Sequence, residues 1–472
     1  MRRLFPKTVR ALVPSAVLLA LGAVAPVSGQ NCPDPDRLAE GTTGAMAHVR
    51  HLADDDLEGR AVGTSGARCA AAYLAARFHA LGLDPAGHEG SYFHTFPVRA
   101  GAELGPDNTF TVEGERLALG QDWAPYGFSA SRAVEAPLVY GGHGLSSPGT
   151  ARDRFSRISI SGKVVVVEAG DPDAPGASSL RADPRFKATV AAGRGAAGML
   201  ILLPEGLALP NVTDETRDAL PIPIAAIGGA TAARVRAAAR QDHVGELRTD
   251  VRPLPVDAQN VVARLPGTDP EHASEHIIVG AHYDHLGFGG EGSLEPGSRA
   301  VHNGADDNAS GTAAVLEIAR ALVDGPPRPR SVLFIAFTGE ERGLWGSARF
   351  VTDPTIDLER SVAMLNLDMV GRLEDGPLTV LGVGTASRWP TLLDEVNDAL
   401  AEPHRIVKRA SGSGLSDHAS FHAEGIPVLH FFTGTHEDYH RPSDDWEKVD
   451  GDGLDRIVTF VSCVVERLAR PR

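Results

Sequence analysis

The 472-residue sequence is poor in positive charge relative to negative charge. It has 45 lysines and arginines against 61 aspartates and glutamates, which gives a formal net charge of −16. Residues 1–29 hold four of the positive charges and no acid, so the remainder carries −20. Such an excess of negative charge argues against nucleic acid or an anionic membrane as a partner. The acidity fits a soluble protein and says little about its substrate.

Cysteine is scarce, with three residues in the whole chain. Export to an oxidising compartment would permit one disulfide, and a bond between Cys32 and Cys69 would tie the start of the mature chain to an early helix. The odd count leaves Cys463. It lies in the helical apolar pattern of Leu454–Leu468, so we expect a buried core thiol and not a catalytic nucleophile.

A long uninterrupted apolar run is also missing near the N-terminus. The stretch Ala11–Val27 contains Pro14 and Pro26, which leaves too few consecutive apolar residues for a membrane span. The basic residues before it and the small residues after it are typical of a signal peptide over residues 1–29. We therefore expect a secreted or periplasmic protein with no membrane partner after signal removal, and an uncleaved anchor is the alternative.

The length of the chain predicts two or three domains. Residues 30–103 contain two helical patterns, Ala45–Leu52 and Cys69–Leu83. From residue 104 to 255, short β-like runs alternate with turns rich in Gly and Pro, and candidate metal ligands are sparse. We expect this stretch, 104–255, to be a separate β-rich domain inserted into a main domain that resumes over residues 256–472.

Strand-like and helix-like runs alternate from Asn260 onward. This alternation predicts an α/β fold with a mixed, mostly parallel central sheet flanked by helices. In such sheets ligands bind beyond the carboxyl ends of the strands, and His282, Glu340 and Asp368 fall at such ends. The expected strands are Ile277–Ala281, Ser331–Phe337, Val362–Leu367, Leu378–Val383 and Pro427–Phe432, and the expected helices are Gly311–Val323, Leu344–Val351, Pro390–Ala401 and Leu454–Leu468.

Histidines and carboxylates recur through the same part of the chain. Zinc accepts imidazole nitrogen and carboxylate oxygen, and two zinc ions that share a water can hydrolyse a peptide bond without a covalent intermediate. Such a pair needs one bridging carboxylate and further ligands on each metal. Cobalt or manganese could occupy the same kind of site. The candidate ligands are His282, Asp306, Glu341, Asp368 and His440.

Two more carboxylates are expected to support the chemistry. Glu340 adjoins Glu341, and if it faces the water it can take a proton and pass it to the leaving amine. Asp284 points to the same side as His282 if the strand continues, where it could accept the other N–H of the imidazole. Roles other than metal ligation are expected for His285, His302, His418, His422, Asp417 and Asp444.

Five short motifs occur in succession in this region. They are His282–Asp284, Asn303–Gly311, Gly339–Ser347, Asn366–Met369 and Tyr439–Asp444. Together they resemble peptidase family M28, in particular its secreted bacterial aminopeptidases with a protease-associated (PA) domain. The resemblance covers nearly the whole mature chain. It implies the phosphorylase/hydrolase-like fold of zinc exopeptidases, with the inserted segment as the PA domain.

The resemblance also implies a role for each site residue. One zinc ion would take His282 and Asp368, and the other would take Glu341 and His440. Asp306 would bridge the two ions, and the Asp306–Asp307 peptide bond would be cis. Glu340 would be the general acid and base.

A competing motif lies at residues 436–440, which read His-Glu-x-x-His, the signature of single-zinc metalloproteases. That motif works on a helix, where residues four apart share a face. Here it follows Gly434, and Pro442 comes two residues after it, where a helix interior would exclude proline. We therefore favour the two-zinc interpretation.

The direction of cleavage remains open at this point. An aminopeptidase holds the substrate ammonium with acidic groups near the metals, and this region is rich in carboxylates. A carboxypeptidase or dipeptidase needs a cationic pocket, for which Arg342, Arg372 and Arg409 are available. A non-catalytic binding homologue would show gaps in the ligand set, and none is visible. A glutaminyl cyclase fits poorly with the insertion. We expect an aminopeptidase that acts on peptides, in an unknown oligomeric state.

Overall fold

The computed structural model describes residues 32–34, 41, 43–145, 153–173, 180–213, 217–290, 292–295, 298–374 and 376–471. The expected signal peptide at residues 1–29 lies outside this part of the chain. Among the described helices, none has the length and apolar character that crossing a membrane requires.

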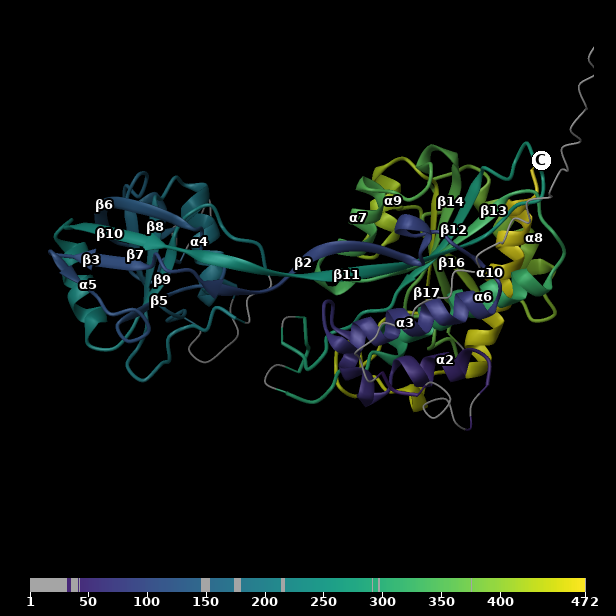
Figure 1. Ribbon diagram of the computed structural model, residues 1–472, viewed down its shortest axis with the longest axis horizontal. Coiled ribbons are helices and arrows are strands. Elements are labelled where there is room, and N and C mark those ends of the chain that lie inside the picture. The colour runs from purple at the N-terminus through teal and green to yellow at the C-terminus, as the bar shows by residue number, and fades with distance from the viewer. Residues whose placement is uncertain are drawn as a thin grey trace, which may run out of the picture.

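Two β-sheets in separate lobes are joined by a long two-stranded arm (Figure 1). The arm consists of β2 (Phe93–Leu104) and β11 (Val251–Leu265), which pair antiparallel along most of their length. The far end of the arm leads to strands between residues 109 and 249, which form the smaller sheet. The near end of β11 continues into the larger sheet through its pairing with a central strand.

The larger sheet has nine strands, and its centre is parallel. Besides β2 and β11, it contains β1 (Asp84–Pro85), β12 (His276–His282), β13 (Ser331–Phe337), β14 (Ser361–Leu367), β15 (Leu378–Leu381), β16 (Ile406–Lys408) and β17 (Val428–Phe432). The strand order is β1-β11-β13-β12-β14-β17-β15-β16, with β2 beside β11. The neighbouring pairs β13/β12, β12/β14 and β14/β17 are parallel. The carboxyl ends of these four strands therefore lie at one edge of the sheet.

Helices cover both faces of this sheet. They are α2 (Ala45–Leu52), α3 (Ser65–Ala80), α6 (Gly311–Asp324), α7 (Trp345–Thr352), α8 (Trp389–Asp398), α9 (His418–Ala423) and α10 (Gly451–Ala469). Alternate residues of each strand point to opposite faces. Val279 of β12 packs into a core with α2, α3, α6, α8 and α10, whereas the adjacent Ile278 packs with α7 and α9. The two-sided burial explains why the central strands read as continuous apolar runs.

The smaller sheet forms cores of its own. Its strands are β3 (Thr109–Val112), β4 (Glu115–Arg116), β5 (Trp123–Pro125), β6 (Arg132–Tyr140), β7 (Val164–Glu168), β8 (Gly198–Leu202), β9 (Ile224–Ile227) and β10 (Val244–Thr249). Two helices, α4 (Pro184–Gly193) and α5 (Thr231–Arg240), pack into separate buried clusters with this sheet. The sequence patterns indicated only strands here. A start signal for α4 is present, since Asp183 caps the helix by accepting the N–H of Phe186 and is followed by proline.

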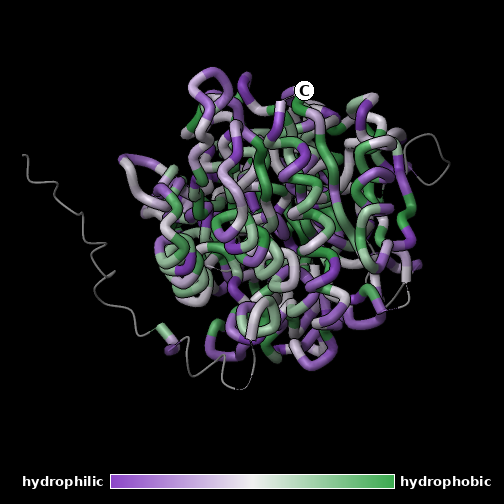
Figure 2. Tube along the Cα trace, turned by 90° about the vertical axis from the view of Figure 1, so that its right-hand side faces the viewer, coloured by the Kyte–Doolittle hydropathy of each residue, from purple (hydrophilic) through white to green (hydrophobic). Residues whose placement is uncertain are grey.

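The two lobes are thus separate packing units with hydrophobic cores of their own. Hydrophobic residues run along the inner segments of the larger lobe, and hydrophilic residues gather on the surrounding loops (Figure 2). Burial of apolar area at about 25 cal/mol per Å² is the main force that holds such layers together.

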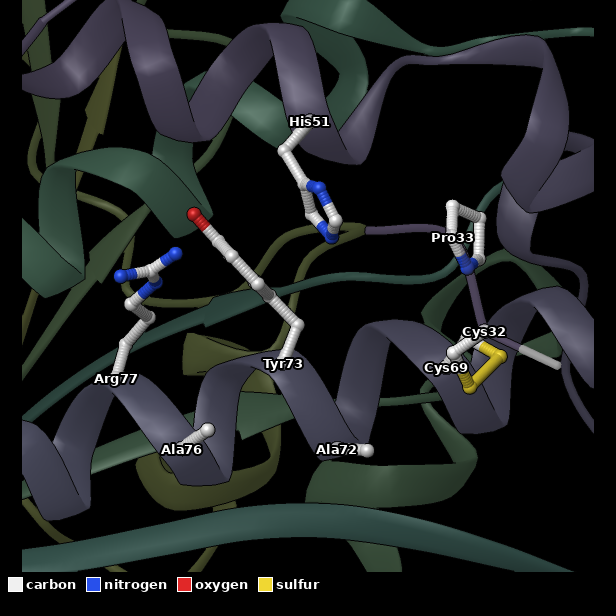
Figure 3. Close-up of a pocket in the computed structure, with 8 residues that line it drawn as sticks. All are labelled: Cys32, Pro33, His51, Cys69, Ala72, Tyr73, Ala76 and Arg77. Atoms are coloured by element: carbon white, nitrogen blue, oxygen red, sulfur yellow. A yellow bond between two sulfur atoms is a disulfide. The ribbon is translucent and has the colours of Figure 1, made fainter. Parts of the chain in front are cut away.

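The disulfide between Cys32 and Cys69 is present, which confirms the expected pairing. It fastens the start of the described chain to α3 and lines a pocket of about 440 Å³ between α2 and α3 (Figure 3). The ring of His51 from α2 stacks on Tyr73 from α3 in this pocket, with 3.8 Å between ring centroids. Cys463 differs from expectation, because it is only partly buried and packs at the border of the core.

Candidate metal centre

The expected site residues come together at the carboxyl edge of the parallel strands. His282 is the last residue of β12, and Asp368 directly follows β14. Glu340 and Glu341 open the short helix η6 (Glu340–Arg342) just beyond β13. His440 lies in the loop after β17. The order of these strands in the sheet therefore brings together residues that are distant in the sequence.

The turn η5 (Ala305–Ser310) leads into α6 and adds an aspartate to the same edge. Asn308 fastens this turn to β14. Its side-chain oxygen accepts the N–H groups of Gly311 and Met369, and its amide donates to the carbonyl oxygen of Leu367. Asp307, one residue earlier, is buried with 3% of its surface exposed.

Asp307 stands between two groups of metal-type donors. On one side its Oδ1 lies 3.4 Å from Nε2 of His282, which also lies 3.5 Å from Oδ1 of Asp368. On the other side its Oδ2 lies 3.2 Å from Nε2 of His440, which also lies 3.2 Å from Oε2 of Glu341. One carboxylate thus faces both groups, which is the arrangement that a bridging ligand requires.

Asp306 is not placed between these groups, in contrast to the expectation. Its Oδ1 accepts the backbone N–H of Gly371 at 2.6 Å and the hydroxyl of Ser310 at 3.0 Å, and its Oδ2 lies 3.1 Å from Nε2 of His436. The physical reason is that neighbouring residues of the turn aim their side chains in different directions, and this carboxylate faces loops behind the site. The cis peptide bond is Asp307–Asn308, so the expected position of that bond is wrong by one residue.

His285 is a donor that sequence reasoning assigned to a supporting role. Its Nδ1 lies 2.6 Å from Oε1 of Glu341, and with Asp307 and Glu341 it forms a group whose ligand atoms all lie within 4.8 Å of one another. Its Nε2 is buried and has no hydrogen-bond partner among the described residues. The signal in the sequence was its position three residues after His282, in the loop that leaves the strand end.

Glu340 and Asp284 lie beside the donors. The backbone N–H of Glu340 donates to Oδ1 of Asp284 at 3.2 Å. Nδ1 of His282 lies 3.2 Å from the main-chain oxygen of Asp284 and 3.8 Å from its carboxylate. The main-chain carbonyl of Asp284 is therefore nearer to Nδ1 of His282 than the carboxylate that was expected to accept from this nitrogen. The carboxylate instead accepts the N–H of Glu340 and holds the loop that carries Glu340. Burial raises the pKa of Asp284 to about 6.

The carboxylates attract positive charge to the space between them. Burial alone would lower the pKa of His440, but hydrogen bonds to Asp307 and Glu341 raise it to about 10. The pKa of His282 is likewise raised, since Glu340 and Asp368 outweigh its burial. Burial would raise the pKa of Asp307, yet its bonds to the two imidazoles lower it to about 2. A buried cluster of this kind suits a divalent cation.

The chemistry of the donors fits zinc. Zinc takes imidazole nitrogen and carboxylate oxygen, and a catalytic site combines a small number of such ligands with an open position. The two groups around Asp307 provide both donor types, and His285 forms a further group with Asp307 and Glu341.

The single-zinc interpretation does not agree with the backbone. Residues 437–440 form turns and not a helix. His436 contacts Asp306 through Nε2, whereas Nε2 of His440 faces Asp307 and Glu341. The two histidines of the motif therefore serve different neighbours.

Another group of metal-type side chains, His88, His94 and Asp353, lies near the start of β2. Both ring nitrogens of His94 have partners there, the amide of Asn260 and the main-chain oxygen of Asp353. These bonds occupy the nitrogens that a metal would need.

Residues 260–465 match peptidase family M28. The aminopeptidase YwaD of Bacillus subtilis is 31% identical over 216 residues, which are 44% of this chain and 44% of that protein. The probable lipoprotein aminopeptidase LpqL of Mycobacterium tuberculosis is 27% identical over 83% of this chain and 74% of its own length. The chain spans less than half the length of the first curated relatives that it matches.

Solved structures extend the likeness to both lobes. An aminopeptidase from Aneurinibacillus sp. strain AM-1 aligns with a TM-score of 0.55 at 23% identity and covers 93% of this chain and 97% of its own. The zinc aminopeptidase BSAP of Bacillus subtilis aligns equally well, at 22% identity over 94% and 97% of the two chains. The chain therefore has the fold of these aminopeptidases, and its residues 260–465 match the model of peptidase family M28.

Proposed function

We propose that this protein is a secreted zinc-dependent aminopeptidase that removes N-terminal residues from peptides. The observation that carries the proposal is the position of Asp307 between two donor groups, with Glu340 beside them. His282 and Asp368 would hold one zinc ion, and Glu341 and His440 would hold the other. When bound, the two ions polarise the scissile carbonyl and make water nucleophilic at neutral pH.

Support for His440 as the ligand comes from its second ring nitrogen. Nδ1 of His440 lies 2.8 Å from the carbonyl oxygen of Gly292 and would donate to it, so in the neutral imidazole that binds zinc the lone pair of Nε2 would face Asp307 and Glu341. This is the usual way in which an outer partner fixes the tautomer of a metal-binding histidine. His285 would then orient Glu341 through their short contact.

Glu340 would move the protons of the reaction. Its carboxylate takes a proton from the attacking water as the water oxygen adds to the carbonyl carbon. It then gives that proton to the leaving nitrogen as the C–N bond breaks. The hydrogen bond from its N–H to Asp284 holds the loop that carries it.

The contacts of Arg372 favour an aminopeptidase over a carboxypeptidase. Arg372 is partly buried and donates to two buried carboxylates, Asp438 and Asp444. Its charge is therefore already balanced within the protein. A substrate ammonium would instead meet the carboxylates of the donor groups.

The smaller lobe would be a PA domain inserted at residues 104–255. It is built on its own sheet and cores, and the arm β2/β11 extends to it from the carboxyl edge of the larger sheet, because β11 runs antiparallel to β13 and its first half lies beyond the end of that strand. We propose that it influences which peptides reach the site.

The test compares two substrates on the same enzyme. An aminoacyl anilide has a free ammonium, and an N-blocked dipeptide has a free carboxylate. Cleavage of the anilide alone supports the aminopeptidase, whereas cleavage of the blocked dipeptide alone would replace it with a carboxypeptidase. Turnover of neither substrate by zinc-loaded protein would favour a binding protein.

A further inference from the structure

Asp444 is a fully buried carboxylate that the proposed reaction does not use. It lies after β17 and contacts the turn η5 through three backbone N–H groups. Its Oδ2 accepts the N–H of Asp306 at 3.0 Å and that of Asp307 at 3.1 Å, and its main-chain oxygen accepts the N–H of Ala305 at 3.0 Å. One residue thus holds three successive peptide groups of the turn.

The other oxygen of Asp444 is fixed by a cation. Nη2 of Arg372 donates to Oδ1 of Asp444 at 3.1 Å and to Oδ2 of Asp438 at 3.3 Å. Asp438 in turn accepts from Lys448 at 2.5 Å and from Ser443 at 2.7 Å. The carboxylate of Asp444 is therefore held from both sides, in a network that pairs two carboxylates with two cations.

These bonds fix the backbone from which the side chain of Asp307 extends. Peptide groups are planar, so fixing the N–H groups of Asp306 and Asp307 fixes the backbone on which the carboxylate of Asp307 stands. Bonds from N–H to an ionised carboxylate are shorter and stronger than bonds between neutral groups. Two of them converge on a single oxygen directly beside the proposed bridging residue.

His436 completes the same support. Its Nε2 lies 3.1 Å from Oδ2 of Asp306, so the loop after β17 binds both the backbone and a side chain of the turn. This contact gives His436 and Asp306 a structural role. Asp306 belongs to neither of the two groups of metal-type donors that flank Asp307.

We propose that Asp444 is a positioning residue that aims Asp307 between the two zinc ions. This inference rests on the proposed function, because it supposes that Asp307 bridges zinc. Outer partners of metal ligands commonly contribute roughly 10- to 100-fold to metal affinity. We expect a loss of that size when Asp444 no longer accepts the two N–H groups.

The experiment measures zinc affinity by competition with a chromophoric chelator, without reference to catalysis. It uses Asp444→Ala, Asp444→Asn and the matched control Asp438→Asn. The control loses a carboxylate that also binds Arg372 but does not touch the turn. The cobalt-substituted proteins provide a second readout, since their visible absorption reports ligand geometry.

We expect zinc affinity to fall roughly 10- to 100-fold in Asp444→Ala, with an altered cobalt spectrum. Asp444→Asn should recover part of the loss, because its amide oxygen can still accept both N–H groups, and Asp438→Asn should stay close to wild type. If Asp444→Ala does not fold, the test becomes whether Asp444→Asn binds zinc more weakly than Asp438→Asn.

Two results would overturn the inference. One is wild-type zinc affinity and an unchanged cobalt spectrum in folded Asp444→Ala. The other is an equal loss in Asp438→Asn, which would assign the effect to the charge of Arg372 alone. Either result leaves the proposed function standing, whereas failure of the wild type to bind about two zinc ions would remove both.

Discussion

Asp306 and Asp307 are adjacent, buried and chemically identical, yet their carboxylates face different neighbours. Asp307 lies within 3.4 Å of a histidine on each side, and Asp306 accepts hydrogen bonds from the backbone of Gly371 and from Ser310. Their substitution by asparagine preserves size and removes one charge. Comparing the two asparagine variants therefore distinguishes a metal ligand from a supporting residue.

We predict that Asp307→Asn loses more zinc affinity than Asp306→Asn. The first removes a charged ligand shared by both metals, so the loss should exceed the roughly 10- to 100-fold effect of an outer partner. The second keeps an oxygen that can accept the bond from Gly371. Isothermal titration with zinc measures both variants, and the opposite ranking would return the bridging role to Asp306.

Glu340 can be tested against a nearby glutamate that the proposed mechanism leaves out. We predict that Glu340→Gln lowers kcat by roughly 10²- to 10⁴-fold, the usual contribution of a general acid or base, and still binds zinc. Glu437→Gln should be as active as wild type, because Glu437 is exposed. Steady-state hydrolysis of an aminoacyl anilide measures both. An inactive Glu437→Gln beside an active Glu340→Gln would support the single-zinc motif instead.

The sequence indicates which residue types form the site but not how a turn aims them. His282, Glu341, Asp368 and His440 were identifiable because they follow apolar runs or lie in recognisable motifs. The choice between Asp306 and Asp307 depends on the direction of two successive side chains in η5, which no pattern of residue types encodes. His285 was not predicted to be a metal ligand for a similar reason, because its position depends on how the chain leaves β12.

Among the helices and strands, those buried on both faces were the predictable ones. β13 has its expected bounds, and β12 and β14 each begin one residue earlier than expected. The arm was missed, because the first half of β11 is mostly exposed and contains Pro253 and Pro255, so neither an apolar run nor a strict alternation marks it.

The disulfide is expected to stabilise the fold without taking part in catalysis. Its cysteines are 37 residues apart, and closing a loop of that length lowers the entropy of the unfolded chain by an amount worth about 3–4 kcal/mol. Cys32→Ser/Cys69→Ser should lose free energy of unfolding of that order in urea and keep its zinc-dependent activity. Cys463→Ser is the control. An unchanged stability of the double variant would contradict the prediction.

The stacked pair His51 and Tyr73 gives the packing of α2 on α3 a dependence on pH. Burial, with the nearby charges of Arg77, His48 and Arg60, lowers the pKa of His51 to about 3. In the unfolded chain the pKa of His51 is about 6.5. The neutral ring of the folded state therefore makes its full contribution to stability above that pH. The contribution is lost progressively as the pH falls from about 6.5 toward 3.

Between pH 7.5 and pH 5 this single group should account for about 2 kcal/mol of lost stability. We predict that His51→Gln shows a smaller difference in the free energy of unfolding between these two pH values than wild type does. The exposed His79 of α3 provides the control as His79→Gln. Equal pH dependence in wild type and His51→Gln would contradict the argument.

In the whole molecule, the metal centre depends on segments from both ends of the chain. Arg60, which is fully buried, donates to the carbonyl oxygens of Asn303 and Gly304 at the start of the turn and to that of Tyr283 after β12. Asp444 holds the N–H groups of the same turn from the other side. The turn is therefore fixed only when the N-terminal segment, the sheet and the loop after β17 are all in place.

In the proposed mechanism two zinc ions share Asp307, and their occupancy produces peptidase activity. Its most direct test is a zinc titration of chelator-stripped protein, with metal content and hydrolysis of an aminoacyl anilide followed together. We predict that activity rises to a plateau at about two zinc ions per chain and that Asp307→Asn abolishes the rise. A plateau at about one ion that survives in Asp307→Asn and disappears in His436→Ala would contradict the account.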